Sequence, residues 1–216
     1  RTWIERLEMV FRESDGQARA ANSLPLLNAR YVVETEEWET RPVTDDSAAP
    51  ELLATGISAV KTGDLATAGA AEARLKTLAE DGNQANQIMY REVAALTRLA
   101  RGEGDEAVAL MEGALEIVAD MRLPNGAASP VKPPYELFGE ILLELDRPAE
   151  AAAKFETSLE RMPGRSLSLL GLARAAARNG DRTTAAEQYQ TLRANWQGRD
   201  QLPGYQEASR YLEQTN

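Results

Sequence analysis

Residues 135–163, YELFGEILLELDRPAEAAAKFETSLERMP, decide the fold, because residues 169–197, LLGLARAAARNGDRTTAAEQYQTLRANWQ, repeat their pattern about 34 residues later. A fixed period of this length is typical of arrays of stacked helical hairpins. The positions that define the first copy are Gly139, Ala151, Phe155 and Pro163, and their equivalents in the second copy are Ala173, Ala185, Tyr189 and Gln197.

The same template, in a weaker form, occurs twice upstream. A helix with a small residue at its middle is followed by a Gly-containing turn and by a second helix that carries another small residue. Small side chains allow paired helices to approach within about 8–10 Å. The residues that carry the two upstream copies are Gly56, Gly63-Asp64 and Ala68, and then Ala95, Gly102, Ala107 and Met111.

Apolar residues recur with a helical period along nearly the whole chain, and no stretch alternates apolar and polar residues as a strand does. The sequence therefore predicts an all-α fold. Ser23 is expected to cap the second helix, with Pro25 in its first turn. The expected helices cover residues 3–11, 26–36, 49–61, 65–78, 84–101, 105–121, 135–145, 148–161, 166–178, 183–196 and 203–212.

We expect one helical-repeat domain over residues 1–216, forming the C-terminal part of a longer array. Within it, the sequence predicts a degenerate repeat at 1–40, two repeats at 49–122, a Pro-rich loop at 123–134, two repeats at 135–198 and a capping helix at 203–214. A terminal helix with a polar outer face is what such arrays need at their ends.

The composition limits the kinds of partner. The formal net charge of −10 disfavours binding to nucleic acid, which requires a basic surface, and to anionic membranes. No apolar run approaches the ~20 residues of a membrane span. We expect a soluble protein, and the excess of Arg and Ala indicates a bacterial source. Both a cytoplasmic and an extracytoplasmic location remain open.

The chain contains no Cys and no His. Thiolate nucleophiles, imidazole bases and the usual zinc ligands are therefore absent from the sequence. Gly102-Glu103-Gly104 and Gly180-Asp181 lack the strand that precedes a phosphate-binding loop, so they are interpreted as turns. We expect no cofactor, no metal site and no catalytic residue.

These repeats resemble the tetratricopeptide repeat (TPR) family, most closely over residues 135–196. The resemblance implies antiparallel helix hairpins stacked into a right-handed superhelix, an α-solenoid, which binds a peptide or protein segment in its concave groove. Thr55 and Glu72 depart from the apolar residues expected in the first unit, and the Lys/Asn set with which some members clamp a C-terminal carboxylate is absent. The residues that carry the resemblance are Tyr135, Phe138-Gly139, Leu142, Ala151, Phe155 and Pro163, and then Leu169, Leu172-Ala173, Gly180, Ala185 and Tyr189.

An acidic stripe is the first candidate site. Glu136, Glu140 and Glu144 are spaced by four residues on one expected helix and share a face. The resemblance implies that this face lines the groove, where the stripe would recognise a cationic segment. Two alternatives remain: acid–base catalysis or cation binding by the carboxylates, and a structural ladder in which Glu140 pairs with Arg174 and Glu144 with Arg178.

Two further candidates flank the stripe. Lys132 lies among prolines in the 123–134 loop, which forms either a rigid lip over the groove or a tether between hairpins. Leu53, Ile57 and Leu96 fall on the inferred groove face, where they either form an apolar binding strip or pack on Trp38 and a missing neighbouring hairpin.

The sequence thus favours a non-catalytic interaction scaffold whose partner is a protein or peptide, apolar at one end and basic at the other. Two alternatives remain open. One is an enzyme or cation-binding protein that uses Glu136, Glu140 and Glu144. The other is a structural or oligomerisation module of a larger protein.

Overall fold

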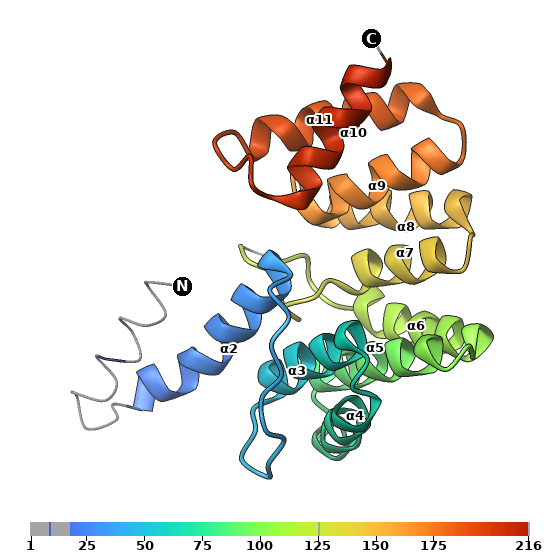
Figure 1. Ribbon diagram of the computed structural model, residues 1–216. Helices are drawn as coiled ribbons and strands as arrows, with labels where there is room; N and C mark the ends of the chain where they lie inside the picture. The colour runs from blue at the N-terminus through green and yellow to red at the C-terminus, as the bar shows by residue number, and fades with distance from the viewer. Residues whose placement is uncertain (1–8, 10–17, 125, 216) are drawn as a thin grey trace. The chain divides into compact units, whose positions relative to one another are not determined.

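The computed structural model describes residue 9, residues 18–124 and residues 126–215. These residues contain ten α-helices and no strand (Figure 1), which confirms the predicted all-α fold. The helix predicted over residues 3–11 lies outside the described residues, apart from Met9.

The chain divides into two compact units. One comprises residues up to Met121 together with Ser129–Lys132, and the other comprises Arg122–Ala128 together with the residues from Pro133 onward. The division falls in the loop that the sequence predicts at residues 123–134.

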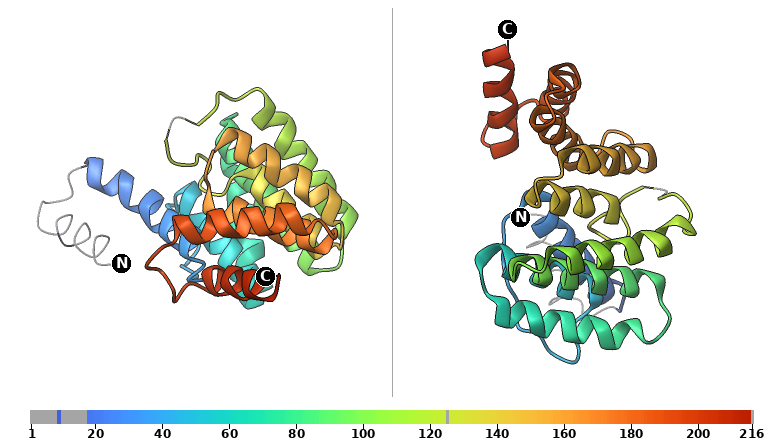
Figure 2. Two further views of the ribbon diagram at one scale, coloured as in Figure 1. Left: turned by 90° about the horizontal axis from the view of Figure 1, so that it is seen from above. Right: turned by 90° about the vertical axis from the view of Figure 1, so that its right-hand side faces the viewer.

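In the first unit each helix packs against the next, and α3 also contacts α5, as in an array of hairpins. In the right panel of Figure 2 the teal to green helices of this unit lie one above another. The helices of this unit are α2 (Ala18–Thr35), α3 (Ala49–Thr62), α4 (Leu65–Ala79), α5 (Gln84–Ala100) and α6 (Gly104–Ala119).

Helix α2 corrects one prediction. It begins at Ala18, so Ser23 does not cap it and Pro25 lies inside it. A proline in a helix interior removes one backbone hydrogen bond and usually breaks the helix. Here Ala18, Ala20 and Ala21 precede it, and alanine has the highest helix propensity, so the helix extends upstream of the proline.

The predicted Gly-Asp turns form as expected. Gly63 ends α3 with φ of 82°, a left-handed conformation that glycine adopts without strain, and Asp64 caps α4 by accepting a hydrogen bond from the Thr67 N–H at 3.0 Å. Asp181 caps α10 in the same way through Thr184. Hydrogen bonds from the Thr184 side chain and backbone hold the pKa of Asp181 below its usual value.

The second unit repeats this succession, and α7 also contacts α9. Its helix boundaries lie within about three residues of the prediction. The arrangement of consecutive packed helices is that of an α-solenoid. The helices of this unit are α7 (Pro134–Glu144), α8 (Pro148–Arg161), α9 (Ser166–Arg178), α10 (Arg182–Asn195) and α11 (Pro203–Thr215).

The core of the second unit is built around the fully buried Phe155. Its ring packs closely against two glycines, since a Cβ added to Gly139 or to Gly171 would fall within 3 Å of ring atoms. Helices α7 and α9 therefore approach Phe155 of α8 closely at positions where only glycine fits. The predicted role of Gly139 as a close-contact residue is consistent with this packing.

Candidate functional site

The predicted apolar strip is part of the core. Leu53 is 0% exposed, and Ile57 and Leu96 are each 2% exposed. The interpretation of these residues as an exposed binding surface was wrong. Helix α3 is contacted by α2, α4 and α5, so a residue that faces outward in an isolated hairpin is covered here by the neighbouring helices.

Glu136 is also buried rather than exposed on a groove. Its carboxylate is 0% exposed and accepts hydrogen bonds from Arg165 Nε at 2.6 Å and from Arg165 Nη2 at 2.9 Å. Ser168 Oγ donates to the same carboxylate at 2.6 Å and lies 2.9 Å from Ser158 Oγ. Side chains from α7, α8, α9 and the turn before α9 thus form one buried polar network, in which Glu136 has no access to a ligand.

The remaining members of the acidic stripe differ in exposure. Glu140 is half-buried and Glu144 is exposed. Arg174 bonds to Glu207 of α11, and Arg178 Nη1 donates to the Leu143 carbonyl at 2.7 Å. The ladder from these arginines to Glu140 and Glu144 stays a prediction.

Lys132 is 5% exposed in the first unit. A lysine with so little exposure cannot present its ammonium group as a solvent-facing lip, so that interpretation was wrong. The alternative interpretation, a tether between hairpins, agrees with its position in the loop that links the two units.

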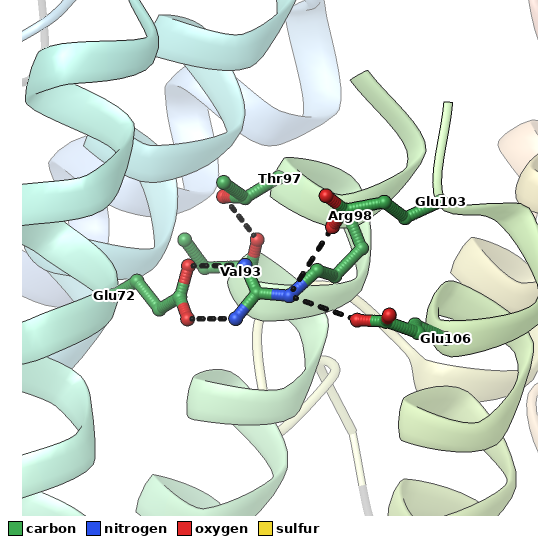
Figure 3. A network of polar contacts seen from close by, with 6 residues as sticks. All are labelled: Glu72, Val93, Thr97, Arg98, Glu103 and Glu106. Atoms are coloured by element: carbon green, nitrogen blue, oxygen red, sulfur yellow. Dashed lines mark hydrogen bonds and ion pairs between the residues drawn. The ribbon is translucent and has the colours of Figure 1, made fainter. Parts of the chain in front are cut away.

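An ion-pair network joins three helices of the first unit (Figure 3). Arg98 of α5 lies 3.2 Å from Glu72 of α4, 3.6 Å from Glu103 and 3.5 Å from Glu106 of α6. Three carboxylates therefore surround one guanidinium. The residues of this unit from 18 onward include 18 Asp and Glu against 10 Lys and Arg, whereas the second unit has 12 against 11. Most of the negative charge of the chain is thus in the first unit.

A polar cluster joins helix α11 to the preceding helices of the second unit. Glu207 accepts two hydrogen bonds from Arg174, at 2.9 and 2.6 Å, and one from the Tyr189 hydroxyl at 2.7 Å. Burial by itself would raise the pKa of Glu207, but the hydrogen bonds from Arg174 and Tyr189 outweigh it and hold that pKa below its usual value. Burial, followed by the bond to Glu207, raises the pKa of Tyr189. On the same helix, Ala208 and Leu212 pack into the hydrophobic core.

Beside this attachment an open cavity of about 470 Å³ lies between α10 and α11. We call it the α10–α11 groove. Helix α10 contributes two polar residues and one alanine, the turn after it contributes Gln197, and α11 contributes two residues about two turns apart. The residues that line the groove are Gln190, Arg193, Ala194, Gln197, Tyr205 and Leu212.

Sequence reasoning missed this groove, although a signal for it was present. Arg193 lies 34 residues after Leu159, so the two occupy equivalent positions in successive hairpins. Leu159 packs against the core cluster of the following hairpin, whereas Arg193 lines the groove. The change from leucine to arginine marks where the apolar stacking surface becomes a polar one.

Neither the models of known protein families nor the curated proteins match this chain. No helix among the described residues is long and apolar enough to cross a membrane. Across residues 18–124 and 126–215, no group of three or more acidic side chains is arranged to hold a metal ion. Any functional assignment therefore depends on the geometry of the surface.

Proposed function

We propose that the protein is a non-catalytic interaction scaffold of the TPR type, which binds an extended segment of a partner protein in the α10–α11 groove. The observation that carries the proposal is the groove itself. It has the size of a ligand pocket, about 300–1,000 Å³. Four of its lining residues, Gln190, Arg193, Gln197 and Tyr205, are polar.

Close contacts hold the helices of the second unit together, which favours binding. Phe155 fixes three helices through Gly139 and Gly171, and Arg174 and Tyr189 fix α11 through Glu207. A surface that is already ordered loses less conformational entropy when a segment binds to it. Interaction scaffolds of stacked hairpins use this property, and the resemblance to the TPR family supports the same role here.

The expectation of a basic region in the partner now depends on the first unit. Glu136 no longer supports it, because that carboxylate is buried and paired with Arg165. The excess of acidic residues in the first unit would attract a basic region over a range of about one Debye length, ~8–10 Å. We propose that this attraction accelerates association, which predicts an association rate constant that falls as salt is added.

A peptide selection tests the proposed function. The full chain is used to select binders from a random dodecapeptide library displayed on phage, and selected peptides are measured by fluorescence anisotropy. Ala194→Trp fills the groove and is expected to weaken binding at least tenfold. Thr191→Trp, at an exposed position of α10 outside the groove, is the matched control and is expected to leave the affinity within twofold.

Two results would contradict the proposal. If the selection enriches no peptide above background, the chain is not a peptide-binding scaffold. If peptides are enriched but bind equally well to Ala194→Trp and Thr191→Trp, the partner binds elsewhere on the chain.

The two other interpretations, an oligomerisation module and a carboxylate enzyme, differ from the scaffold as follows. An oligomerisation module would appear as a concentration-dependent change of mass in multi-angle light scattering. A carboxylate enzyme would depend on the acidic stripe, of which Glu136 is fully buried.

A further inference from the structure

We propose that the α10–α11 groove recognises its segment through the side-chain carboxylate of an Asp or Glu residue, which binds the guanidinium of Arg193. This inference rests on the proposed function and specifies the chemistry of the ligand. It concerns only the portion of the partner that enters the groove, and it is separate from the attraction of a basic region to the first unit.

Unused hydrogen-bonding groups converge on the groove. Arg193, Gln190, Gln197 and Tyr205 all line it. Among the described residues, none of these four side chains forms an ion pair or a hydrogen bond, whereas Arg174, Arg165 and Arg98 are all paired with carboxylates. The groove thus offers donors that the fold itself does not use.

The carboxylate of Glu207 on α11 is already hydrogen-bonded within the fold. Glu207 belongs to α11, but both of its oxygens accept hydrogen bonds from Arg174, and Oε1 also accepts one from Tyr189. It therefore serves the attachment of α11 and does not neutralise Arg193. The positive charge of Arg193 remains available to a ligand.

The repeat comparison indicates what kind of ligand fits. In the preceding hairpin the position equivalent to Arg193 is Leu159, which packs against the core of the next hairpin. Another apolar hairpin stacked on α10 would bury Arg193 without a partner, and an unpaired buried charge is costly. A segment that brings a carboxylate avoids this cost.

The remaining groups match the backbone of an extended segment. The planar guanidinium of arginine forms two parallel hydrogen bonds to a carboxylate. The amide groups of Gln190 and Gln197 each offer donors and an acceptor, as a peptide backbone does. Gln190 lies about one turn before Arg193 on α10, and Gln197 lies in the turn that follows the helix. The lining of the groove therefore offers a guanidinium to one carboxylate and two side-chain amides to the backbone of a peptide.

The test uses the selected peptides, synthesised with amidated C-termini so that the only carboxylates are those of side chains. We expect an Asp or Glu at one fixed position. Replacing it by Asn or Gln is expected to weaken the dissociation constant at least tenfold, and Arg193→Gln is expected to do the same. In the double-mutant cycle, the two changes together should weaken the dissociation constant no more than either change alone.

Arg182→Gln is the matched control, since Arg182 is an exposed arginine on α10 outside the groove. It is expected to leave the dissociation constant within twofold. Melting temperatures of both arginine variants verify that neither change unfolds the protein.

The outcomes separate this inference from the proposed function. Peptides that lack a fixed acidic residue, yet lose binding in Ala194→Trp, would overturn the carboxylate and leave the scaffold intact. Additive losses in the cycle would also overturn it. A dimer of the full chain that dissociates in Ala194→Trp would show that a second copy occupies the groove, and would overturn it as well.

Discussion

At the scale of single residues, the close contacts of Phe155 lead to the first prediction. Gly139→Leu and Gly171→Ala each place atoms where the ring of the fully buried Phe155 lies. Overpacking of this kind typically costs ~1–3 kcal/mol. Urea denaturation is expected to show this loss in the free energy of unfolding.

Gly69→Ala is the control for both glycine variants. Gly69 lies inside α4, and nothing lies within 4 Å of an added Cβ. Alanine is favoured over glycine in a helix by about 1 kcal/mol, so this variant should be at least as stable as the parent. Equal stability of all three variants would mean that the ring is free to shift.

The buried pair of Glu136 and Arg165 leads to a second prediction. Removing one partner of a buried ion pair leaves the other uncompensated and typically costs ~3–5 kcal/mol. Glu136→Gln is therefore expected to lower the free energy of unfolding by about this amount.

The comparison for this variant is Glu150→Gln. Glu150 is paired with Arg147 on the exposed surface of α8, where solvent screens the interaction, so little change in stability is expected. If the two variants were equally stable, the network around Glu136 would contribute nothing specific.

At the scale of elements, the attachment of α11 depends on pH. The pKa of Glu207 is lower in the folded protein than the unfolded value of about 4.3. Its contribution to stability is therefore fully present above that unfolded value. It is lost as the pH falls through the folded pKa, because the protonated carboxyl no longer pairs with Arg174.

Hydrogen exchange provides the measurement for this pH dependence. Protection of the α11 amides is expected to decrease in acid before that of α9, and Glu207→Gln is expected to remove most of the difference. Protection of α11 that stays equal to that of α9 down to the global acid transition would contradict this assignment.

At the scale of the whole molecule, the boundary between the two units is a candidate cleavage site. The described residues between α6 and α7 contain no helix, and Arg122 and Leu123 are exposed there. Proteases cut exposed segments without regular structure in preference to packed helices. Brief trypsin treatment of the native protein should therefore cut after Arg122 before it cuts between α3 and α6 or between α7 and α10, as mass spectrometry of the fragments would show.

The sequence alone determined the helices and their order. Local signals fix these features: the 34-residue period, the Gly63-Asp64 and Gly180-Asp181 turns, and the prolines at 134 and 148 all act within a few residues of the chain. Helix α2 was the exception, because Pro25 was interpreted as a start signal and the upstream alanines proved sufficient to extend the helix.

Only the tertiary structure decided which polar and apolar residues are available to a partner. Glu136 shares a helical face with the exposed Glu144, yet Arg165 and Ser168 enclose it. Leu53 was expected on the groove face, yet the neighbouring helices bury it. Arg174 bonds to Glu207, a residue 33 positions away, and this bond leaves Arg193 as the unpaired arginine of the groove among the described residues. The period of a helix gives the face on which a side chain lies. What covers that face depends on contacts between residues distant in the chain.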